Sequence, residues 1–352
     1  RQGGLPDLSR WWRTFDDPLL ADLVDRAIAN NLDIAQAVAR LRQARASLIA
    51  SRADLFPSVE GSAGAGRNFD NGRRDTNSYS LGADARWTID LFGGTRRAIE
   101  ASRADLQAAG YDLASVQAAI AAETARNYVA LRDTQARLAN ARDVLGTQEE
   151  NLRIAGWRVQ AGLVSSLDLE QARTQRAQTL ASIPALESAV AAAENRLAVL
   201  TGVAPGTLAT ELSGVRPIPT GPSGFAVGIP ADTLRNRPDL RTAERDLAAA
   251  TARIGVAQAA LLPALSISGN VGTSALSFGS LGDVVTGGLF AGLSQIIFDG
   301  GRRIAAVRGQ EAAAQGALAR YRQVVLTGLE DVENGLVALA SARVRRGAQA
   351  AV

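Results

Sequence analysis

The sequence predicts a mainly α-helical chain with two pairs of long amphipathic β-strands, built as a tandem repeat. Eight residues at positions between Asn30 and Pro57 have an identical residue 206 positions later, between Asn236 and Pro263. Apolar and polar residues alternate over 78–92, with the period of a β-strand. Leu, Ile and Val stand seven apart over much of the stretch that follows, which is the spacing of a coiled coil.

The composition narrows the possible function classes. The 352 residues contain no Cys, no His and no Met, and all 38 basic residues are Arg. Thiol nucleophiles, imidazole bases, Schiff-base lysines and ordinary transition-metal sites are therefore missing. The net charge is only +3, and Arg and acidic residues are interspersed, so the sequence shows no basic patch of the kind that binds nucleic acid. We predict no enzyme, no cofactor, no metal site and no nucleic-acid partner; an Arg/carboxylate hydrolase is the most distant alternative.

The repeat and the Pro/Gly-rich stretch between its copies divide the chain. The predicted segments are an N-terminal segment 1–17, a first repeat 18–202, a linker 203–228 and a second repeat 229–352.

Helix signals open the first repeat. Asp17 and Pro18 have the residue types of an N-cap and a first helical position, so a short helix is expected to about Asn30. A second helix begins at Asp33 and ends at Pro57, because proline disfavours a helical conformation in the residue before it.

Two strands follow in the first repeat, a Gly-rich one over about 58–68 and a longer one over 78–92. The longer strand places apolar residues on one face and polar residues on the other, as in the wall of a membrane β-barrel. A long hairpin on a soluble sheet fits the alternation equally well. The apolar residues that we expect to face a membrane are Tyr79, Leu81, Trp87, Ile89 and Leu91.

The second repeat supplies a matching pair of strands over about 265–273 and 287–298, followed by a long helix from 301. Glycines separate strand from helix in both repeats, and we expect them to turn the chain there. These residues are Gly93, Gly94, Gly300 and Gly301.

A long antiparallel helical hairpin is predicted over 94–202. The first helix runs to about Gln160, which is roughly 100 Å at 1.5 Å per residue. Gly162 permits the reversal, and a return helix begins at Leu167. No stretch of eighteen or more uninterrupted apolar residues is present, so no transmembrane helix is predicted.

This element list constrains the assembly. Four strands cannot close a barrel, and the edges of an open sheet cannot be satisfied in lipid, so membrane strands would have to be shared among several copies of the chain. The helices greatly exceed a bilayer core of about 30 Å and would project into water. A barrel continued by a helical cylinder is a duct.

Several motifs, in order along the chain, resemble the outer membrane factor family, the TolC-like channels of tripartite efflux pumps. The opening Trp-Trp segment points to the lipoprotein branch, which serves resistance-nodulation-division (RND) pumps. The matching segments are Trp11–Pro18, Trp157–Leu163, Arg237–Glu244 with its continuation to Pro263, and Phe298–Arg302.

The resemblance implies a homotrimer in the bacterial outer membrane, extending into the periplasm. Each chain would give four strands to a shared trimeric β-barrel and long coiled-coil helices to a periplasmic α-barrel. The implied partners are outer-membrane lipid, a periplasmic adaptor (membrane fusion) protein and an inner-membrane RND-type pump. The implied function is passive export of drugs or other small molecules, with antibiotic resistance as one consequence.

The resemblance places the adaptor contact at the hairpin tip, where an exposed apolar side chain could meet a partner helix; a plain helix-hairpin turn is the alternative. The tip residues are Arg158, Gly162, Leu163, Val164, Ser165 and Ser166. The resemblance also implies a lipid anchor on an N-terminal Cys, which these residues do not include.

Arg158 has no counterpart in the second repeat, since 158 plus 206 exceeds 352. We therefore expect the natural protein to be longer, and the gate residues that the family carries on the second tip are not identified. The alternative function of a different class is a soluble periplasmic coiled-coil adaptor or scaffold.

Overall fold

The computed structural model describes residues 8–69, 75–221 and 236–350. The chain forms two compact units: the core unit, 1–38 with 113–228, and the sheet unit, 39–112 with 229–352. This division differs from the two predicted repeats. The reason is that two long helices, α2 (Leu32–Ala53) and α3 (Gly94–Gln160), each run from one unit into the other.

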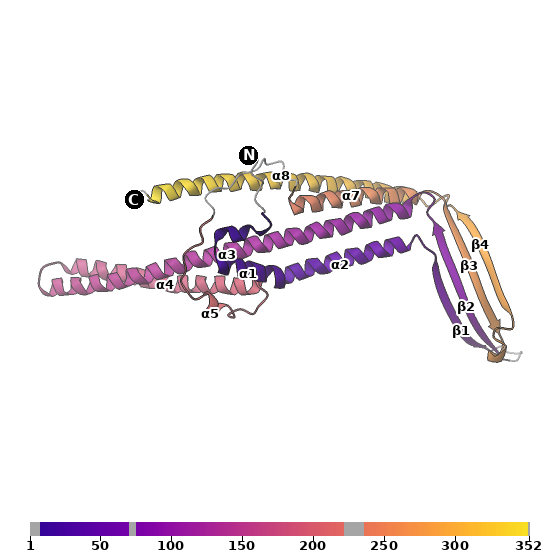
Figure 1. Cartoon of the computed structure of the whole chain (residues 1–352), viewed down its shortest axis with the longest axis horizontal. Coiled ribbons are helices and arrows are strands. Elements are labelled where there is room, and N and C mark those ends of the chain that lie inside the picture. The colour runs from indigo at the N-terminus through magenta and orange to yellow at the C-terminus, as the bar shows by residue number, and fades with distance from the viewer. Residues whose placement is uncertain (1–7, 70–74, 222–235, 351–352) are drawn as a thin grey trace. The chain divides into compact units, whose positions relative to one another are not determined.

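The core unit is helical. Besides parts of α2 and α3, it holds a 3₁₀ helix (Leu8–Phe15), α1 (Pro18–Asn30), α4 (Ser166–Leu200) and α5 (Ala209–Leu212) (Figure 1). The predicted linker 203–228 thus contains a short helix; its residues 222–228 lie outside the described residues, as do 1–7 and 229–235.

Asp17 fixes the start of α1. Its Oδ1 accepts hydrogen bonds from the backbone N–H groups of Leu19 (2.9 Å) and Leu20 (3.1 Å), and Pro18 takes the first helical position. Its Oδ2 accepts a bond of 2.8 Å from the hydroxyl of Tyr128 on α3. One side chain therefore caps a helix and ties it to a second helix.

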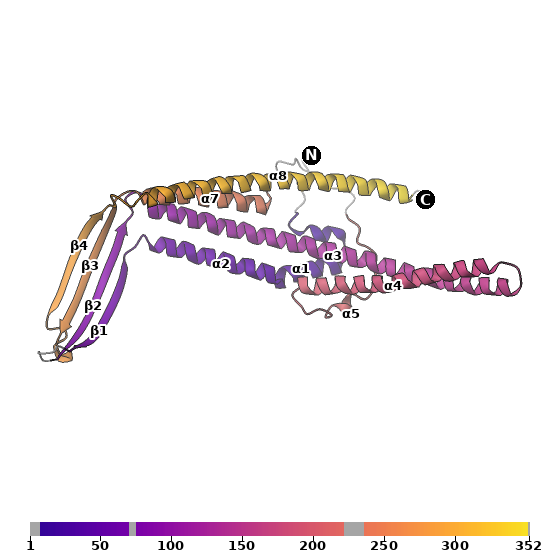
Figure 2. The same ribbon diagram turned by 180° about the vertical axis from the view of Figure 1, so that it is seen from behind.

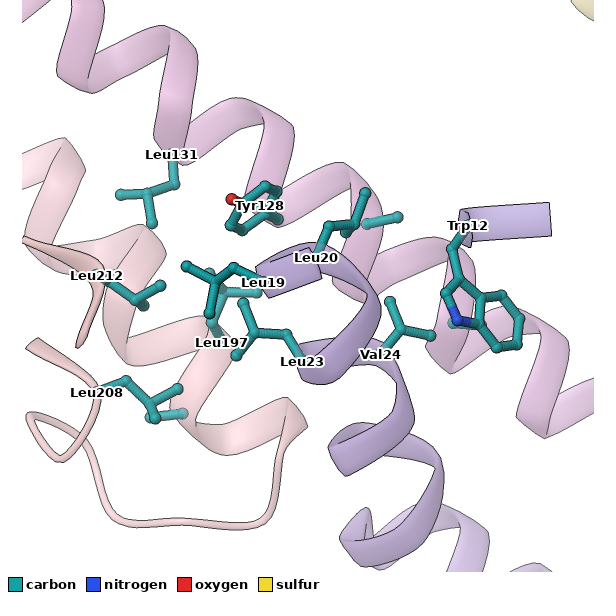
Figure 3. Close-up of a cluster of buried hydrophobic side chains, with 13 residues drawn as sticks. Trp12, Leu19, Leu20, Leu23, Val24, Tyr128, Leu131, Leu197, Leu208 and Leu212 are labelled. Atoms are coloured by element: carbon teal, nitrogen blue, oxygen red, sulfur yellow. The ribbon is translucent and has the colours of Figure 1, made fainter. Parts of the chain in front are cut away.

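Leucines on four helices share one interior in this unit (Figure 3). The buried cluster draws on the 3₁₀ helix, α1, α3, α4 and the segment around α5, so it closes a core within one chain. Its largest members are Trp12, Leu19, Leu20, Leu23, Val24, Tyr128, Leu131, Leu197, Leu208 and Leu212.

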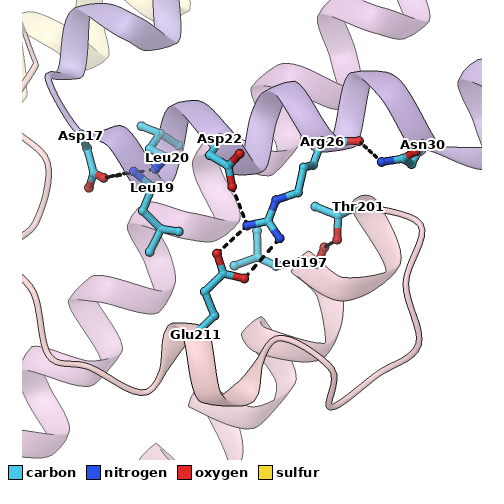
Figure 4. Close-up of polar contacts among 9 residues, drawn as sticks. All are labelled: Asp17, Leu19, Leu20, Asp22, Arg26, Asn30, Leu197, Thr201 and Glu211. Atoms are coloured by element: carbon cyan, nitrogen blue, oxygen red, sulfur yellow. Dashed lines mark hydrogen bonds and ion pairs between the residues drawn. The ribbon is translucent and has the colours of Figure 1, made fainter.

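An ion pair joins α1 to α5 across 185 residues of sequence. Arg26 donates to both carboxylate oxygens of Glu211, at 2.6 and 3.2 Å, and it also contacts Asp22 at 2.7 Å. Figure 4 shows this bridge beside the Asp17 cap. All three side chains are partly solvated, so the bridge adds less to stability than the leucine cluster does.

Arg132 is completely buried in α3. Its Nη1 donates to the carbonyl oxygens of Gly214 (2.7 Å) and Leu212 (3.3 Å) and to Gln135 Oε1 (2.7 Å), while its guanidinium lies 4.8 Å from the Tyr128 ring centroid. This side chain holds the segment after α5 against α3. Burial raises the pKa of Tyr128 above its usual value.

The helical hairpin of α3 and α4 is tied by ion pairs along its length. Arg142 contacts Glu187 at 2.7 Å, and Arg176 contacts Glu149 at 2.8 Å. Pro184 lies inside α4, which nevertheless continues to Leu200. Because these ion pairs are exposed, they add little to the stability of the hairpin, but they favour one register of α4 along α3.

In the sheet unit, α7 (Pro238–Ala259) packs along α8 (Arg302–Ala350). Arg237 donates to both carboxylate oxygens of Asp239, at 2.7 and 3.1 Å, and reaches Asp331 of α8 at 2.9 Å. The paired guanidinium lowers the pKa of Asp239. Within the ranges that the structure describes, no helix has the length and apolar character needed to cross a membrane.

Four strands form one antiparallel sheet in the order β1-β2-β3-β4. They are β1 (Ser58–Asn68), β2 (Thr76–Ile89), β3 (Ala264–Ala275) and β4 (Val285–Ser294). The central pairing of β2 with β3 joins the first repeat to the second. Figures 1 and 2 show the sheet from opposite sides.

Two predicted strand ends are wrong, and both follow from where β3 begins. β2 ends at Ile89 rather than 92, which puts Leu91 outside the strand, and β4 spans 285–294 rather than 287–298. Continuing the register, Leu91 and Gln295 would both lie opposite Pro263. The chain still turns at 260–262 after α7 and β3 begins only at Ala264, so neither neighbouring strand has a partner strand beyond that point.

Candidate functional site

The register gives the sheet two faces of opposite character. Directly paired residues point to the same side, and every pair joins odd with odd or even with even numbers. The even-numbered face carries mainly Ser, Thr, Gly, Asn and charged residues. The odd-numbered, apolar face has polar residues only near the end that carries the β1–β2 and β3–β4 connections, namely Arg67, Asn77 and Thr273. Its apolar residues are Val59, Ala63, Ala65, Tyr79, Leu81, Ala83, Ala85, Trp87, Ile89, Leu265, Ile267, Val271, Ala275, Val285, Leu289, Ala291 and Leu293.

Side-chain positions agree with this division. A Cβ placed on Gly64 would lie 2.9 Å from Ser80 Oγ, and one on Gly82 would lie 3.3 Å from Ser62 Oγ, so the hydroxyls share the even-numbered face. A Cβ on Gly269 would instead meet Leu289 Cδ1 at 3.5 Å, on the odd-numbered face. The alternation predicted for one strand therefore extends over all four.

Tyr79, Leu81, Trp87 and Ile89 lie on the apolar face, as the alternation predicts. Aromatic residues mark its two ends. Tyr79 meets Phe278 edge-on, with ring centroids 6.0 Å apart, and Trp87 Nε1 donates to the Leu55 carbonyl at 3.0 Å. Eight residues separate Tyr79 from Trp87, about 26 Å along the strand, close to the height of the apolar band of outer-membrane barrels.

No residue of the four strands is buried. β1 and β4 are the edge strands, and every residue of β1 is exposed. Both faces and both edges of the sheet thus lack a partner within the described chain. Exposed edges can pair with a further strand, and an exposed apolar face is a surface for association.

Glycines lie between strand and helix in both repeats. Gly93, Gly300 and Gly301 have φ of +81°, +67° and +86°, a region that disfavours side chains. Gly94 differs, since its φ is not positive. A Cβ there would lie 3.1 Å from Ala259 Cβ, so close packing against α7 is its constraint.

Two aspartates at these turns, Asp90 and Asp299, were not singled out from the sequence. Asp90 accepts from the backbone N–H groups of Thr95 (3.1 Å) and Arg96 (3.0 Å) at the start of α3. Asp299 accepts from the N–H groups of Gly301 (3.0 Å) and Arg303 (3.2 Å) at the start of α8. An acidic residue shortly before each helix was the available signal.

The hairpin tip begins with a Schellman turn. Gly162 has φ of +70° and donates its N–H to the Val159 carbonyl at 2.9 Å, while Leu163 N–H donates to the Arg158 carbonyl at 2.9 Å. Ser165 then caps α4, and its N–H donates to Asp168 Oδ2 at 3.2 Å. Ser166 is the first residue of α4.

Exposure differs between the two apolar tip candidates. Leu163 is 73% exposed, whereas Val164 is half-buried. Trp157 and Leu167, which were not singled out from the sequence, are also exposed near the turn. The structure therefore presents an apolar group of three side chains at the tip, and Arg158 beside it is exposed as well.

The described residues contain no cluster of three or more His, Cys, Asp or Glu that could hold a metal ion. The candidate functional features are therefore surfaces: the two-faced sheet, the strand-to-helix turns, and the exposed apolar side chains at the tip of the helical hairpin.

Comparisons with known proteins agree on one family. The family profile described as "Outer membrane efflux protein" matches residues 23–203 and 229–351. Nodulation protein T of Rhizobium leguminosarum bv. trifolii is 32% identical over 336 residues, covering 94% of this chain and 72% of its own length. The pyoverdine export outer membrane protein OpmQ of Pseudomonas aeruginosa is 32% identical over 346 residues, with shares of 94% and 72%.

Solved structures give the same result. The outer-membrane channel OprN matches with a TM-score of 0.88 and 37% identity, over 96% of this chain and 77% of its own. The CmeC outer membrane channel of Campylobacter jejuni matches with a TM-score of 0.87 and 25% identity, over 97% and 75%. The predicted family and fold class are confirmed: the chain belongs to the outer membrane efflux protein family.

Proposed function

We propose that this protein is the passive outer-membrane exit duct of a tripartite efflux system, and that it acts as a homotrimer. The observation that carries the proposal is the two-faced sheet. Its apolar face suits lipid, its polar face suits a water-filled lumen, and a lipid-exposed sheet must have its edges paired. Three copies with four strands each would close a twelve-strand barrel, with β4 of one copy beside β1 of the next.

A soluble adaptor or scaffold receives no support from these features. It would leave Leu81, Leu289 and Leu293 of one face in water, where they are 52%, 80% and 68% exposed. The family relationship also favours the duct. We propose no catalysis. The protein acts by enclosing a water-filled passage through the membrane.

We extend the proposal to two partners, a periplasmic adaptor that contacts the hairpin tip and an inner-membrane RND-type pump that supplies energy. Leu163, Trp157 and Leu167 support the adaptor contact, since exposed apolar side chains on a helical hairpin can pack against a partner helix. The lipid anchor stays a prediction.

The duct is tested with the full-length protein, purified in detergent and reconstituted in planar lipid bilayers. We expect light scattering to give the mass of a trimer. After reconstitution we expect discrete conductance steps that persist under an applied voltage. A monomer that is stable without detergent and gives no conductance would contradict the proposal.

A further inference from the structure

One bulky apolar side chain breaks the pattern of the polar face. Phe290 of β4 pairs with Ser268 of β3, so it points to the even-numbered side. Every other residue on that side of the four strands is polar, charged, Gly or Ala. Phe290 is 62% exposed, and it lies among the residues that line the lumen in the proposed duct.

Its neighbour in the strand leaves room for the ring. A Cβ on Gly288 would lie 2.7 Å from Phe290 Cζ and 2.8 Å from Cε2. The same Cβ would lie 3.3 Å from Asn270 Oδ1. The ring is therefore folded back along β4, over the cross-strand row that contains Gly288 and Asn270.

That row continues into two carboxylates. Gly288 pairs with Asn270, Asn270 with Asp84, and Asp84 with Glu60. Two strand spacings, about 10 Å, separate Gly288 from Asp84. The Phe290 ring, which leans from its own row toward Gly288, thus lies at the β4 end of a row that carries paired acidic side chains toward β1.

The charge on this face is negative. Arg86, which stands in the same cross-strand row as Ser268 and Phe290, is the one basic side chain on the even-numbered face of the described strands, against Asp84 and Glu60. None of the ion pairs found within the described residues joins Arg86 to either carboxylate. The face therefore carries an excess of one negative charge per copy.

We propose that Phe290, Asp84 and Glu60 form a transit site for aromatic cations inside the duct. The ring stacks on the planar part of the solute, and the carboxylates attract its charge. Both contacts are partly exposed to water, so binding is weak enough for release toward the outside. The inference rests on the proposed function, because the polar face must line the lumen.

The test uses the full-length protein in planar bilayers and ethidium as the probe. We expect ethidium to block the current, and Phe290→Ala to weaken the block about fivefold, the loss expected for one aromatic contact with a cation. Asp84→Asn combined with Glu60→Gln should weaken it by at least as much. Tetraethylammonium, a cation without a ring, should respond to the charge variants and not to Phe290→Ala.

Leu289→Ala is the matched control, because Leu289 is the adjacent residue on the apolar face and should leave the ethidium block unchanged. Phe290→Leu keeps an apolar side chain but removes the ring, and it replaces Phe290→Ala if that variant does not assemble. If Phe290→Ala channels conduct and ethidium blocks them as strongly as the unaltered channel, the transit site is refuted, while the proposed duct is not. If the unaltered protein gives no conductance, both the duct and the transit site are refuted.

Discussion

Leucine side chains have opposite surroundings in the two units. In the core unit, Leu20, Leu23 and Leu197 are fully buried against residues from distant parts of the same chain. In the sheet unit, Leu289 and its neighbours on the apolar face have no such cover. The core unit completes its interior alone, whereas in the proposed duct the sheet depends on lipid and on further copies. Under that proposal, stability in one region is a property of the chain, and in the other a property of the assembly.

The largest effect is expected from a cavity in the core unit. Leu197→Ala removes a fully buried side chain from the cluster of Figure 3 and should cost about 2–5 kcal/mol of unfolding free energy. The measurement is chemical unfolding of the detergent-solubilised protein, followed by circular dichroism. Leu289→Ala, at an exposed position, should cost less than about 1 kcal/mol. Equal losses for the two variants would contradict the comparison.

A charge on the apolar face comes next. Val271 lies about midway along the apolar face, opposite Ala83. Val271→Arg should raise the free energy of inserting the strand into a bilayer by about 2–4 kcal/mol per copy. We expect loss of the trimer from outer-membrane fractions, with little change in the helical signal of the purified chain. Asn270→Arg, one residue away on the polar face, should assemble normally. If both variants assemble alike, the assignment of the two faces is wrong.

The smallest effect on stability is expected at the tip. Leu163→Asp changes an exposed side chain, so its unfolding free energy should stay within about 0.5 kcal/mol of the unaltered protein. Binding to the adaptor whose gene neighbours its own should nevertheless weaken by about tenfold or more, measured by surface plasmon resonance. Leu163→Ile should retain that binding. Full affinity of Leu163→Asp would refute the adaptor contact at this residue.

Much of the functional surface could be predicted from local pattern. The alternation around Tyr79 and Leu81 identified a two-faced strand, and Gly162 identified a reversal, because period and glycine conformation depend only on neighbours in the chain. Leu91 was assigned to a strand because alternation alone cannot show where a partner strand begins. The start of β3 at Ala264 decides that.

Phe290 was missed for the same reason. Its position follows from the alternation of Leu289, Ala291 and Leu293, yet only the pairing with Ser268 shows which neighbours share its face. The buried position of Arg132 had no signal in the sequence, since the carbonyl groups that it contacts lie about 80 residues away along the chain.

The sequence by itself determined the family, the tandem repeat, the long coiled-coil hairpin and the existence of a strand with two faces. These depend on composition and on periods of two, seven and 206 residues, which are local or directly countable. Only the tertiary structure decided the strand register, the placement of Phe290 on the same face as Asp84 and Glu60, and the division into core and sheet units. Those depend on contacts between residues distant in the chain, which close packing and backbone hydrogen bonding select and no periodicity records.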